Sequence, residues 1–286
     1  MTRTFLRIAS IATGALIVGG ATLAQVNSGS TAGSSQNTDS TGTTSATNRA
    51  ANAASGSGNT RSSSNSGSMS GTTAGTASGA NAQGQPTYAG GSNDQQSFGR
   101  PAKIFIDRKA NEAYIADGYG NKRVAVLDIT TGAIKRFWGA YGNVPSDSNL
   151  GRYNPAAPLA QQFRNPVHCA EPSNDGLVYV CDRPNDRIQV FTKDGKFVKE
   201  QQYVPATLGD GSVWDIAFSK DAAQKYIFLA DGKNERVYVI DRQSLAVITQ
   251  FGDGGRQPGQ FFAVHSIATD SKGNLYTTET YEGKRL

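Results

Sequence analysis

Two histidines are the side chains of this 286-residue chain whose type and placement best suit metal binding. His168 follows a Pro-Val dipeptide and His265 follows an Ala-Val dipeptide, so each stands near the start of an apolar segment. Imidazole nitrogens are good ligands for zinc and similar metals. A catalytic zinc ion uses three protein ligands, and the sequence holds no third histidine. Zinc at His168 and His265 is one expectation, and two histidines packed without a metal are the other.

The two cysteines, Cys169 and Cys181, also have a suggestive spacing. They lie at about equal distances from an Asn-Asp turn in a segment, 167–182, that has the pattern of a hairpin. Opposite positions on adjacent strands are close enough for a disulfide, which is a reasonable feature of an exported protein. We expect the bridge, and two buried free thiols are the alternative.

The segments around these residues recur four times along the chain. The repeated motif reads DGYGNKRVAVLD, DRPNDRIQVFT, DGKNERVYVID and ETYEGKRL, starting at positions 117, 182, 231 and 279. Its arginines are spaced by 64, 49 and 49 residues. They are Arg123, Arg187, Arg236 and Arg285. Repeats of about 40–50 residues built from short strands are typical of a β-propeller with one four-stranded blade per repeat.

The sequence therefore predicts an all-β propeller over residues 98–286. We expect blades near 98–140, 160–203, 208–254 and 258–286, the last one cut short. Each begins with an inner strand, so the two histidines should face one shared central channel. The recurring arginines should brace turns or neighbouring blades. A longer connection, 141–162, is predicted to be a rim or lid loop, with a plain insertion as the alternative.

The region before the repeats has the composition of targeting and linker sequence. Two arginines followed by an apolar run over 8–23 and small residues predict a signal peptide at 1–24. The alternative is an uncleaved anchor, for which the run is short. Residues 25–97 are rich in Ser, Gly, Thr and Asn and predict a disordered linker. We therefore expect an exported protein, periplasmic, secreted or on the cell surface, without a stable membrane span after cleavage.

Charge excludes one class of partner. The chain has a net charge of +5. Only four of its 28 basic and two of its 23 acidic residues precede position 98, which leaves about +3 on the repeats. The basic residues form no run or stripe of the kind that nucleic-acid-binding proteins show. We therefore expect no nucleic-acid partner.

The repeats also resemble a known family. Residues 255–286 look like an NHL repeat, with a PGQF start, an apolar strand and a D-x-x-G-N turn. Within that superfamily the motifs are most similar to peptidyl-α-hydroxyglycine α-amidating lyases. The matching segments are ADGYGNKRV at 116–124, PVHCAEPSNDGLVYVCDRPNDRIQ at 166–189 and AVHSIATDSKGNLY at 263–276. Three matches in the same order are more specific than any one of them.

This resemblance implies roles for particular residues. Three channel histidines hold zinc in the lyases, and His168 and His265 match two of them. Tyr119 matches the proposed catalytic base, and Arg183 matches an arginine that binds the substrate carboxylate. The family chemistry splits the N–C bond of a carbinolamide into an amide and glyoxylate. Ser266 stands where the family has an acidic residue, a further departure.

NHL propellers usually have six blades, and the resemblance implies that two early blades are absent. We favour a fragment or rearranged relative of such a protein over a closed four-bladed ring. Open blade edges would also allow self-association. The predicted function is an exported binding or scaffold module for a protein, peptide or glycan at the rim or channel. The alternative is a zinc-dependent amidating-lyase-like enzyme or hydrolase with an incomplete site, and we rank it second.

Overall fold

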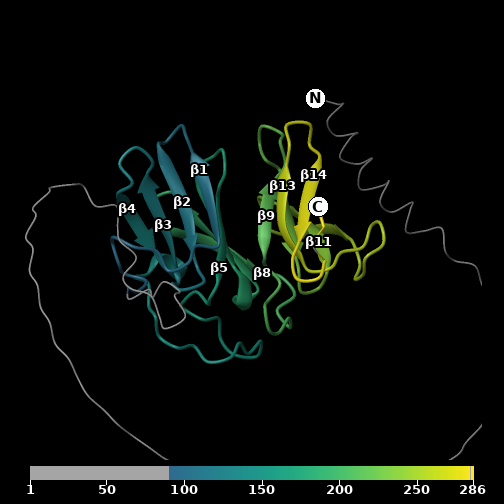
Figure 1. The fold of residues 1–286 in the computed structure, drawn as a ribbon, viewed down its shortest axis with the longest axis horizontal. Helices are drawn as coiled ribbons and strands as arrows, with labels where there is room; N and C mark the ends of the chain where they lie inside the picture. Colours follow the sequence, from purple (N-terminus) through teal and green to yellow (C-terminus); the bar gives the residue numbers. More distant parts are fainter. Residues whose placement is uncertain (1–89, 284) are drawn as a thin grey trace, which may run out of the picture. The chain divides into compact units, whose positions relative to one another are not determined.

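The computed structural model describes residues 90–283, Arg285 and Leu286, whose regular secondary structure is almost entirely β-strand (Figure 1). The predicted signal peptide, 1–24, and most of the predicted linker lie outside the described residues. Within the described part, no helix is long and apolar enough to cross a membrane. Two short 3-10 turns, η1 (Ala140–Gly142) and η2 (Arg183–Asn185), are the helical elements of this part.

The strands form four antiparallel sheets, in which neighbours in the chain are neighbours in the sheet. The first sheet contains β1 (Lys103–Asp107), β2 (Glu112–Asp117), β3 (Arg123–Asp128) and β4 (Ile134–Trp138). The second contains β5 (Val167–Pro172), β6 (Leu177–Asp182), β7 (Arg187–Thr192) and β8 (Phe197–Gln202). The third contains β9 (Asp215–Phe218), β10 (Tyr226–Asp231), β11 (Arg236–Asp241) and β12 (Val247–Phe251). The fourth pairs β13 (Val264–Thr269) with β14 (Leu275–Glu279).

The first strands of successive sheets lie side by side. β5 contacts both β1 and β9, and β9 contacts β13. Each sheet is thus one up-and-down blade with its first strand innermost, which is the arrangement of a β-propeller. The predicted all-β propeller class is confirmed.

Apolar cores fill the spaces between successive blades, because alternate residues of a strand point to opposite faces of its sheet. In β6, Val178 and Val180 face the first blade and pack with Tyr114 and Val126. Tyr179 and Cys181 face the third blade, in a cluster that includes Ile216 and Leu229. A third cluster joins the third and fourth blades. A blade therefore holds its neighbours through both faces.

The recurring arginines brace the turns as predicted. Arg123 donates from Nε to Asp117 over 2.9 Å, and Arg187 donates to Asp182 over 2.7 Å, with both pairs fully buried. Arg285 makes the same contact with Glu279 over 2.7 Å. In the first two blades the pair joins the end of the second strand to the start of the third, and in the fourth it joins the end of β14 to Arg285. In the third blade, Arg236 donates instead to the carbonyl of Asn234, and the Asn234 side chain binds Asp231.

The predicted linker ends earlier than position 97. Ser92 is fully buried and donates from its backbone N–H and hydroxyl to Asp147. Arg123 donates to the carbonyls of Ser92, Asp94 and Ser97. Prediction of a disordered segment through residue 97 was therefore wrong over its last residues, because a buried guanidinium binds their carbonyl oxygens.

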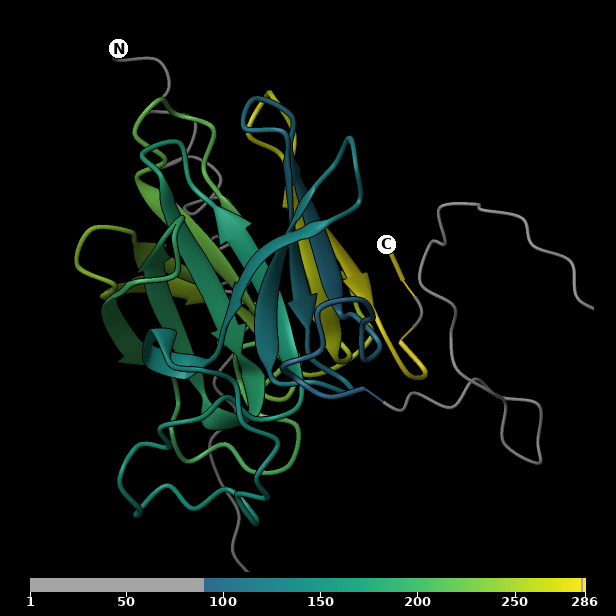
Figure 2. The same ribbon diagram turned by 90° about the vertical axis from the view of Figure 1, so that its left-hand side faces the viewer.

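The long connection 141–162 runs along one end of the sheets. Figures 1 and 2 show it, in teal, at their lower end. Tyr153 in this connection donates to the carbonyl of Pro205, at the end of the second blade. Arg164, just after it, donates to the carbonyls of Leu150 and Gly151. These contacts fix the connection beside the loops that carry the predicted site residues.

Candidate ligand site at the central channel

Four residues singled out from the sequence come together at one end of the channel. The phenol oxygen of Tyr119 lies 3.1 Å from Nε2 of His168. The His168 and His265 rings meet edge to face, with their centroids 4.8 Å apart. Arg183 lies close enough to lower the pKa of both histidines. The site therefore draws on loops or strands of the first, second and fourth blades.

Gly118 allows the Tyr119 loop to approach the second blade. A Cβ atom on Gly118 would stand 2.0 Å from the carbonyl oxygen of Val167, the residue before His168. Only glycine, which lacks Cβ, permits such a close approach of two backbones. Asn165 holds the same loop by donating to the carbonyls of Gly118 and Asn121. Local sequence thus brings the phenol of Tyr119 to the imidazole.

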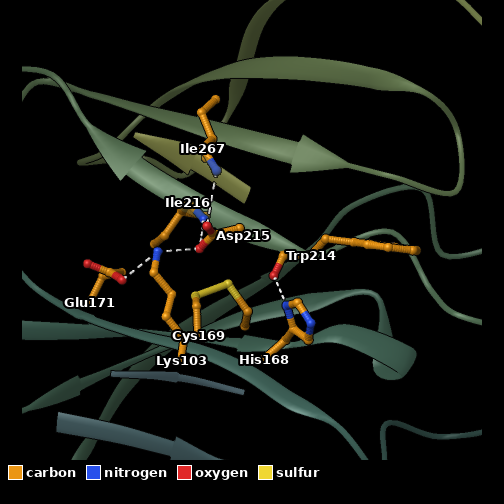
Figure 3. Close-up of a disulfide and its surroundings, with 9 residues drawn as sticks. Lys103, His168, Cys169, Glu171, Trp214, Asp215, Ile216 and Ile267 are labelled. Atoms are coloured by element: carbon orange, nitrogen blue, oxygen red, sulfur yellow. Dashed lines mark hydrogen bonds and ion pairs between the residues drawn. A yellow bond between two sulfur atoms is a disulfide. The ribbon is translucent and has the colours of Figure 1, made fainter. Parts of the chain in front are cut away.

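The tautomer of His168 is set by its neighbours. Its Nδ1 lies 2.5 Å from the carbonyl oxygen of Trp214, which can only accept a hydrogen bond (Figure 3). Nδ1 must therefore carry the proton, and Nε2 accepts from the hydroxyl of Tyr119. Burial, followed by the positive charge of Arg183, lowers the pKa of His168 to about 3. The imidazole is neutral and acts as an acceptor at its Nε2 face.

His265 is half-buried, with its Nδ1 3.2 Å from the hydroxyl of Ser266. Burial and then Arg183 lower its pKa as well. Two neutral imidazoles beside a guanidinium leave the site with one positive charge, whose carboxylate partner, Asp210, stands 3.6 Å away. This arrangement favours an anion over a further cation.

Arg183 supplies that positive charge from the turn η2. Its side chain is only 8% exposed, and its guanidinium carbon lies 4.6 Å from the ring centroid of Trp214. The nearest carboxylate oxygen among the described residues belongs to Asp210, 3.6 Å from Nη2 and 44% exposed at its side chain. The Nε–H has no hydrogen-bond partner. A buried guanidinium with such incomplete pairing can bind an anionic ligand.

Trp214 is a site residue that the sequence reasoning missed. It contacts His168, His265 and Arg183 through its ring. Its place in the third repeat, after Ser212-Val213, is the place of the two histidines in their own repeats. Asp215 pairs with Ala230 just as Cys169 pairs with Cys181, so the preceding residues are equivalent. Alignment of the repeats could have found it.

An ion cluster of the inner strands lies beside this site. Lys103 of β1 binds Asp215 of β9 over 2.6 Å and Glu171 of β5 over 2.8 Å (Figure 3). Asp215 also accepts from the backbone N–H of Ile267 on β13. Burial raises the pKa of Asp215, and it raises the pKa of Glu171 to about 7. The cluster joins the inner strands of all four blades, and only the tertiary structure reveals it.

The predicted disulfide is present. Cys169 on β5 and Cys181 on β6 are bonded and form part of the core between the second and third blades. Figure 3 shows the bridge next to His168 and the ion cluster. It therefore fixes the strand that carries His168 to its neighbour.

The described residues do not fit a three-ligand zinc site. Nδ1 of His168 is bound to a carbonyl, and its Nε2 faces the hydroxyl of Tyr119. Over residues 90–283 and 285–286, no three His, Cys, Asp or Glu side chains are grouped so that they could hold a metal ion. A nearby guanidinium also opposes a second cation. Of the three protein ligands that the expected zinc ion needs, the described residues therefore offer only two, His168 and His265.

Known proteins resemble the chain over part of its length. A comparison with protein-family models found no match. Peptidyl-glycine alpha-amidating monooxygenase B of Xenopus laevis is 33% identical over 109 residues, which are 38% of this chain and 11% of that protein. The human NHL repeat-containing protein 3 is 25% identical over 167 residues, which are 58% of this chain and 40% of that protein. The chain therefore spans less than half of these relatives.

Solved structures give weaker similarities. The hydrazine synthase of Kuenenia stuttgartiensis aligns with a TM-score of 0.44 and 14% identity, covering 69% of this chain and 47% of that one. A streptogramin B lyase structure aligns with a TM-score of 0.44 and 16% identity, covering 64% and 49%. The predicted resemblance to NHL-type propellers and to the amidating proteins is confirmed by the sequence relatives.

Proposed function

We propose that this NHL-type propeller module binds a ligand with a free carboxylate, such as the C-terminus of a peptide, at the channel site. The observation that carries the proposal is Arg183, a buried guanidinium whose Nε–H has no partner. An arginine presents paired N–H donors that match the two oxygens of a carboxylate. The carboxylate of the ligand would give Arg183 a closer and better aligned partner than Asp210, which is 3.6 Å away and 44% exposed at its side chain.

The neighbouring side chains support a ligand with a polar group beside the carboxylate. Tyr119 is 42% exposed, and its hydroxyl donates to His168. Its oxygen keeps acceptor capacity for a ligand N–H or O–H. The Trp214 ring packs against the guanidinium of Arg183, with 4.6 Å between the guanidinium carbon and the ring centroid. Tyr119, Arg183 and Trp214 would together orient the last residue of a peptide.

The test compares two probes that differ only in charge at one end. N-acetyl-Phe-Gly with a free carboxylate should bind the full-length protein in calorimetry, and its C-terminal amide should bind at least about tenfold more weakly. Arg183→Gln should remove the difference between the probes, whereas the exposed control Arg108→Gln should keep it. Equal binding of acid and amide to the wild-type protein would refute the proposal.

A second candidate is lyase chemistry on α-hydroxyglycine-ended peptides. The contact between Tyr119 and His168 favours it, because it places a phenol oxygen in the site with Arg183. In this reaction Tyr119 accepts the hydroxyl proton as it passes its own proton to Nε2 of His168, a C=O bond forms, the C–N bond breaks, and the leaving amide nitrogen takes up a proton. The products are an amide and glyoxylate. We rank it second because the described residues lack three metal ligands.

Glyoxylate release measures this second candidate directly. The wild-type protein would release glyoxylate from an α-hydroxyglycine-ended peptide, and Tyr119→Phe would stop the release while retaining binding of the free-acid probe. If the protein binds the free-acid probe but releases no glyoxylate, the lyase candidate is refuted and only the carboxylate-binding function remains.

We also propose that the protein is exported. The Cys169–Cys181 disulfide supports this location, because such bonds persist in oxidising compartments. Fractionation of the source cells, followed by thiol alkylation and mass spectrometry, tests it. Detection of the reduced protein in the cytoplasm would contradict the proposal.

A further inference from the structure

A cleft of about 580 Å³ lies beside the channel site, between the long connection and the loops that follow β6 and β8. This volume is within the usual range for a small-molecule site. Three basic residues line it, Lys122, Arg152 and Arg164, and no acidic residue does. This arrangement could not be predicted from the sequence, because the three residues belong to separate segments and form no basic run.

Lys122 is buried in the wall of the cleft without an ion pair. Its Nζ donates to the carbonyl oxygen of Ser148 over 2.6 Å, and no carboxylate oxygen of the described residues lies within ion-pair distance. Burial lowers the pKa of Lys122; Asp147 opposes this effect and Arg164 adds to it. The ammonium group thus lacks a close counterion.

Like Lys122, Arg164 donates hydrogen bonds from its side chain to neutral oxygen atoms of the described residues and not to a carboxylate. It donates to the carbonyls of Gly151 and Leu150 and to the side-chain oxygen of Asn185. Its guanidinium carbon is 5.8 Å from the ring centroid of Tyr153. Burial lowers the pKa of Arg164, although Asp182 partly offsets this effect. No carboxylate of the described chain forms an ion pair with it.

Arg152 adds an exposed positive charge at the same cleft. Neither a hydrogen bond nor an ion pair restrains its side chain within the described residues, so it is free to close over a ligand. Leu150, Pro184 and Leu208 provide apolar walls, and Tyr153 an aromatic one. The cleft therefore combines three cations with a surface suited to the carbon skeleton of a ligand.

We infer that this cleft binds an organic phosphate monoester, with the phosphate among Lys122, Arg152 and Arg164 and the organic group against Tyr153 and Leu208. A phosphate monoester carries close to two negative charges at neutral pH. Arginine and lysine are the usual partners of phosphate oxygens. A singly charged sulfate ester would compensate less of the positive charge and would bind more weakly. The site is distinct from the carboxylate site at Arg183.

Calorimetry on the full-length protein with phenyl phosphate tests this inference. We expect phenyl phosphate to bind more tightly than phenyl sulfate, and phenol to show no measurable binding. Arg152→Gln should lower the affinity for phenyl phosphate about three- to tenfold, and Lys122→Gln should lower it about tenfold or more. The matched control Lys109→Gln, an exposed lysine away from the cleft, should bind as the wild type does. Added salt should weaken the interaction.

The variants also separate this site from the one at Arg183. Arg183→Gln should leave phenyl phosphate binding unchanged, and Arg152→Gln should leave binding of the free-acid peptide unchanged. Unaltered phenyl phosphate affinity in Arg152→Gln would overturn the inference, as would an equal loss in Lys109→Gln. Loss in Arg183→Gln alone would assign the phosphate to the channel instead. Because Arg152 is exposed, its variant keeps the test valid even if Lys122→Gln fails to fold.

Discussion

The hydroxyl of Tyr119 donates to Nε2 of His168 over 3.1 Å, although the two residues belong to different blades and are 49 positions apart in the chain. The contact exists because Gly118 lets the loop of the first blade touch the inner strand of the second. It connects the phenol of Tyr119, a residue that is 42% exposed, to a buried, neutral imidazole. The same imidazole contacts the ring of Trp214, which in turn packs against Arg183, so the four side chains form one cluster.

Removal of the Tyr119 hydroxyl should weaken ligand binding without unfolding the protein. In Tyr119→Phe the ring remains against His168, and only the hydrogen bond is lost. We expect affinity for the free-acid peptide to fall about three- to tenfold, with an unchanged melting temperature. Calorimetry and circular dichroism measure the two effects. An unaltered affinity would show that the phenol does not contact the ligand.

A methyl group at position 118 should disrupt the approach of the two blades. Gly118→Ala would place Cβ 2.0 Å from the Val167 carbonyl oxygen, closer than real contacts allow. We expect the Tyr119 loop to shift, so that ligand binding falls and the Tyr119–His168 contact is lost. Gly132→Ala is a matched control for a glycine with open space around it, although its φ of +74° carries its own strain. A crystal structure of Gly118→Ala with the contact intact would disprove this explanation.

Acid should destabilise the fold through His168. Its pKa is lowered from 6.5 to about 3 in the folded protein, so the unfolded chain binds a proton first as the pH falls. The free energy of unfolding should therefore lose about 1.4 kcal/mol per pH unit from this residue below about pH 6.5, until the folded pKa is reached. His168→Gln should lack this contribution. Urea unfolding between pH 6 and pH 5 provides the measurement.

The pH dependence of unfolding must be compared between the wild-type protein and His168→Gln, because other groups also titrate between pH 5 and pH 7. Burial raises the pKa of Glu171 and of Asp186 to about 7, and that of Asp231 to about 6. These carboxyls gain protons in the folded state first, so they stabilise it as the pH falls. The slope of wild type minus variant isolates His168. An identical slope in both proteins would contradict the predicted pKa shift.

Loss of the disulfide should lower the stability by about 2–4 kcal/mol, since the bridge closes a short loop in the unfolded chain. The cysteines are 12 positions apart and fully buried. Cys169→Ala/Cys181→Ala tests this by urea unfolding, and reduction of the wild-type protein serves as the control for lost packing. If reduction changes nothing while the double variant loses stability, the effect belongs to packing and not to the covalent bond.

Zinc should not support the carboxylate site. After dialysis against a chelator, the protein should bind the free-acid peptide as before, because Arg183, Tyr119 and Trp214 hold it. Elemental analysis of zinc-treated protein should show no stoichiometric zinc that is lost in His168→Ala/His265→Ala. If the wild-type protein binds one equivalent of zinc and the double variant does not, the prediction that the two histidines hold no zinc is wrong. The lyase candidate would then be favoured.

The sequence alone determined the repeated part of this protein. Strand periodicity and Asn, Asp and Gly turns are local properties, and they sufficed to predict blades, the disulfide and a bracing role for the recurring arginines. The equivalent places of His168 and His265 in two repeats also predicted that both face one channel. Arg183 could be selected through its resemblance to a family motif.

Only the tertiary structure decided which of these residues meet and what surrounds them. Lys103 reaches Asp215 across 112 positions, and Trp214 takes the third inner position beside the histidines. The basic cleft likewise combines segments that share no local pattern. Such contacts depend on how blades pack face to face and how closely their loops approach, and these distances are set by the packed cores between sheets. The periodicity of a single strand or turn does not predict these contacts between blades.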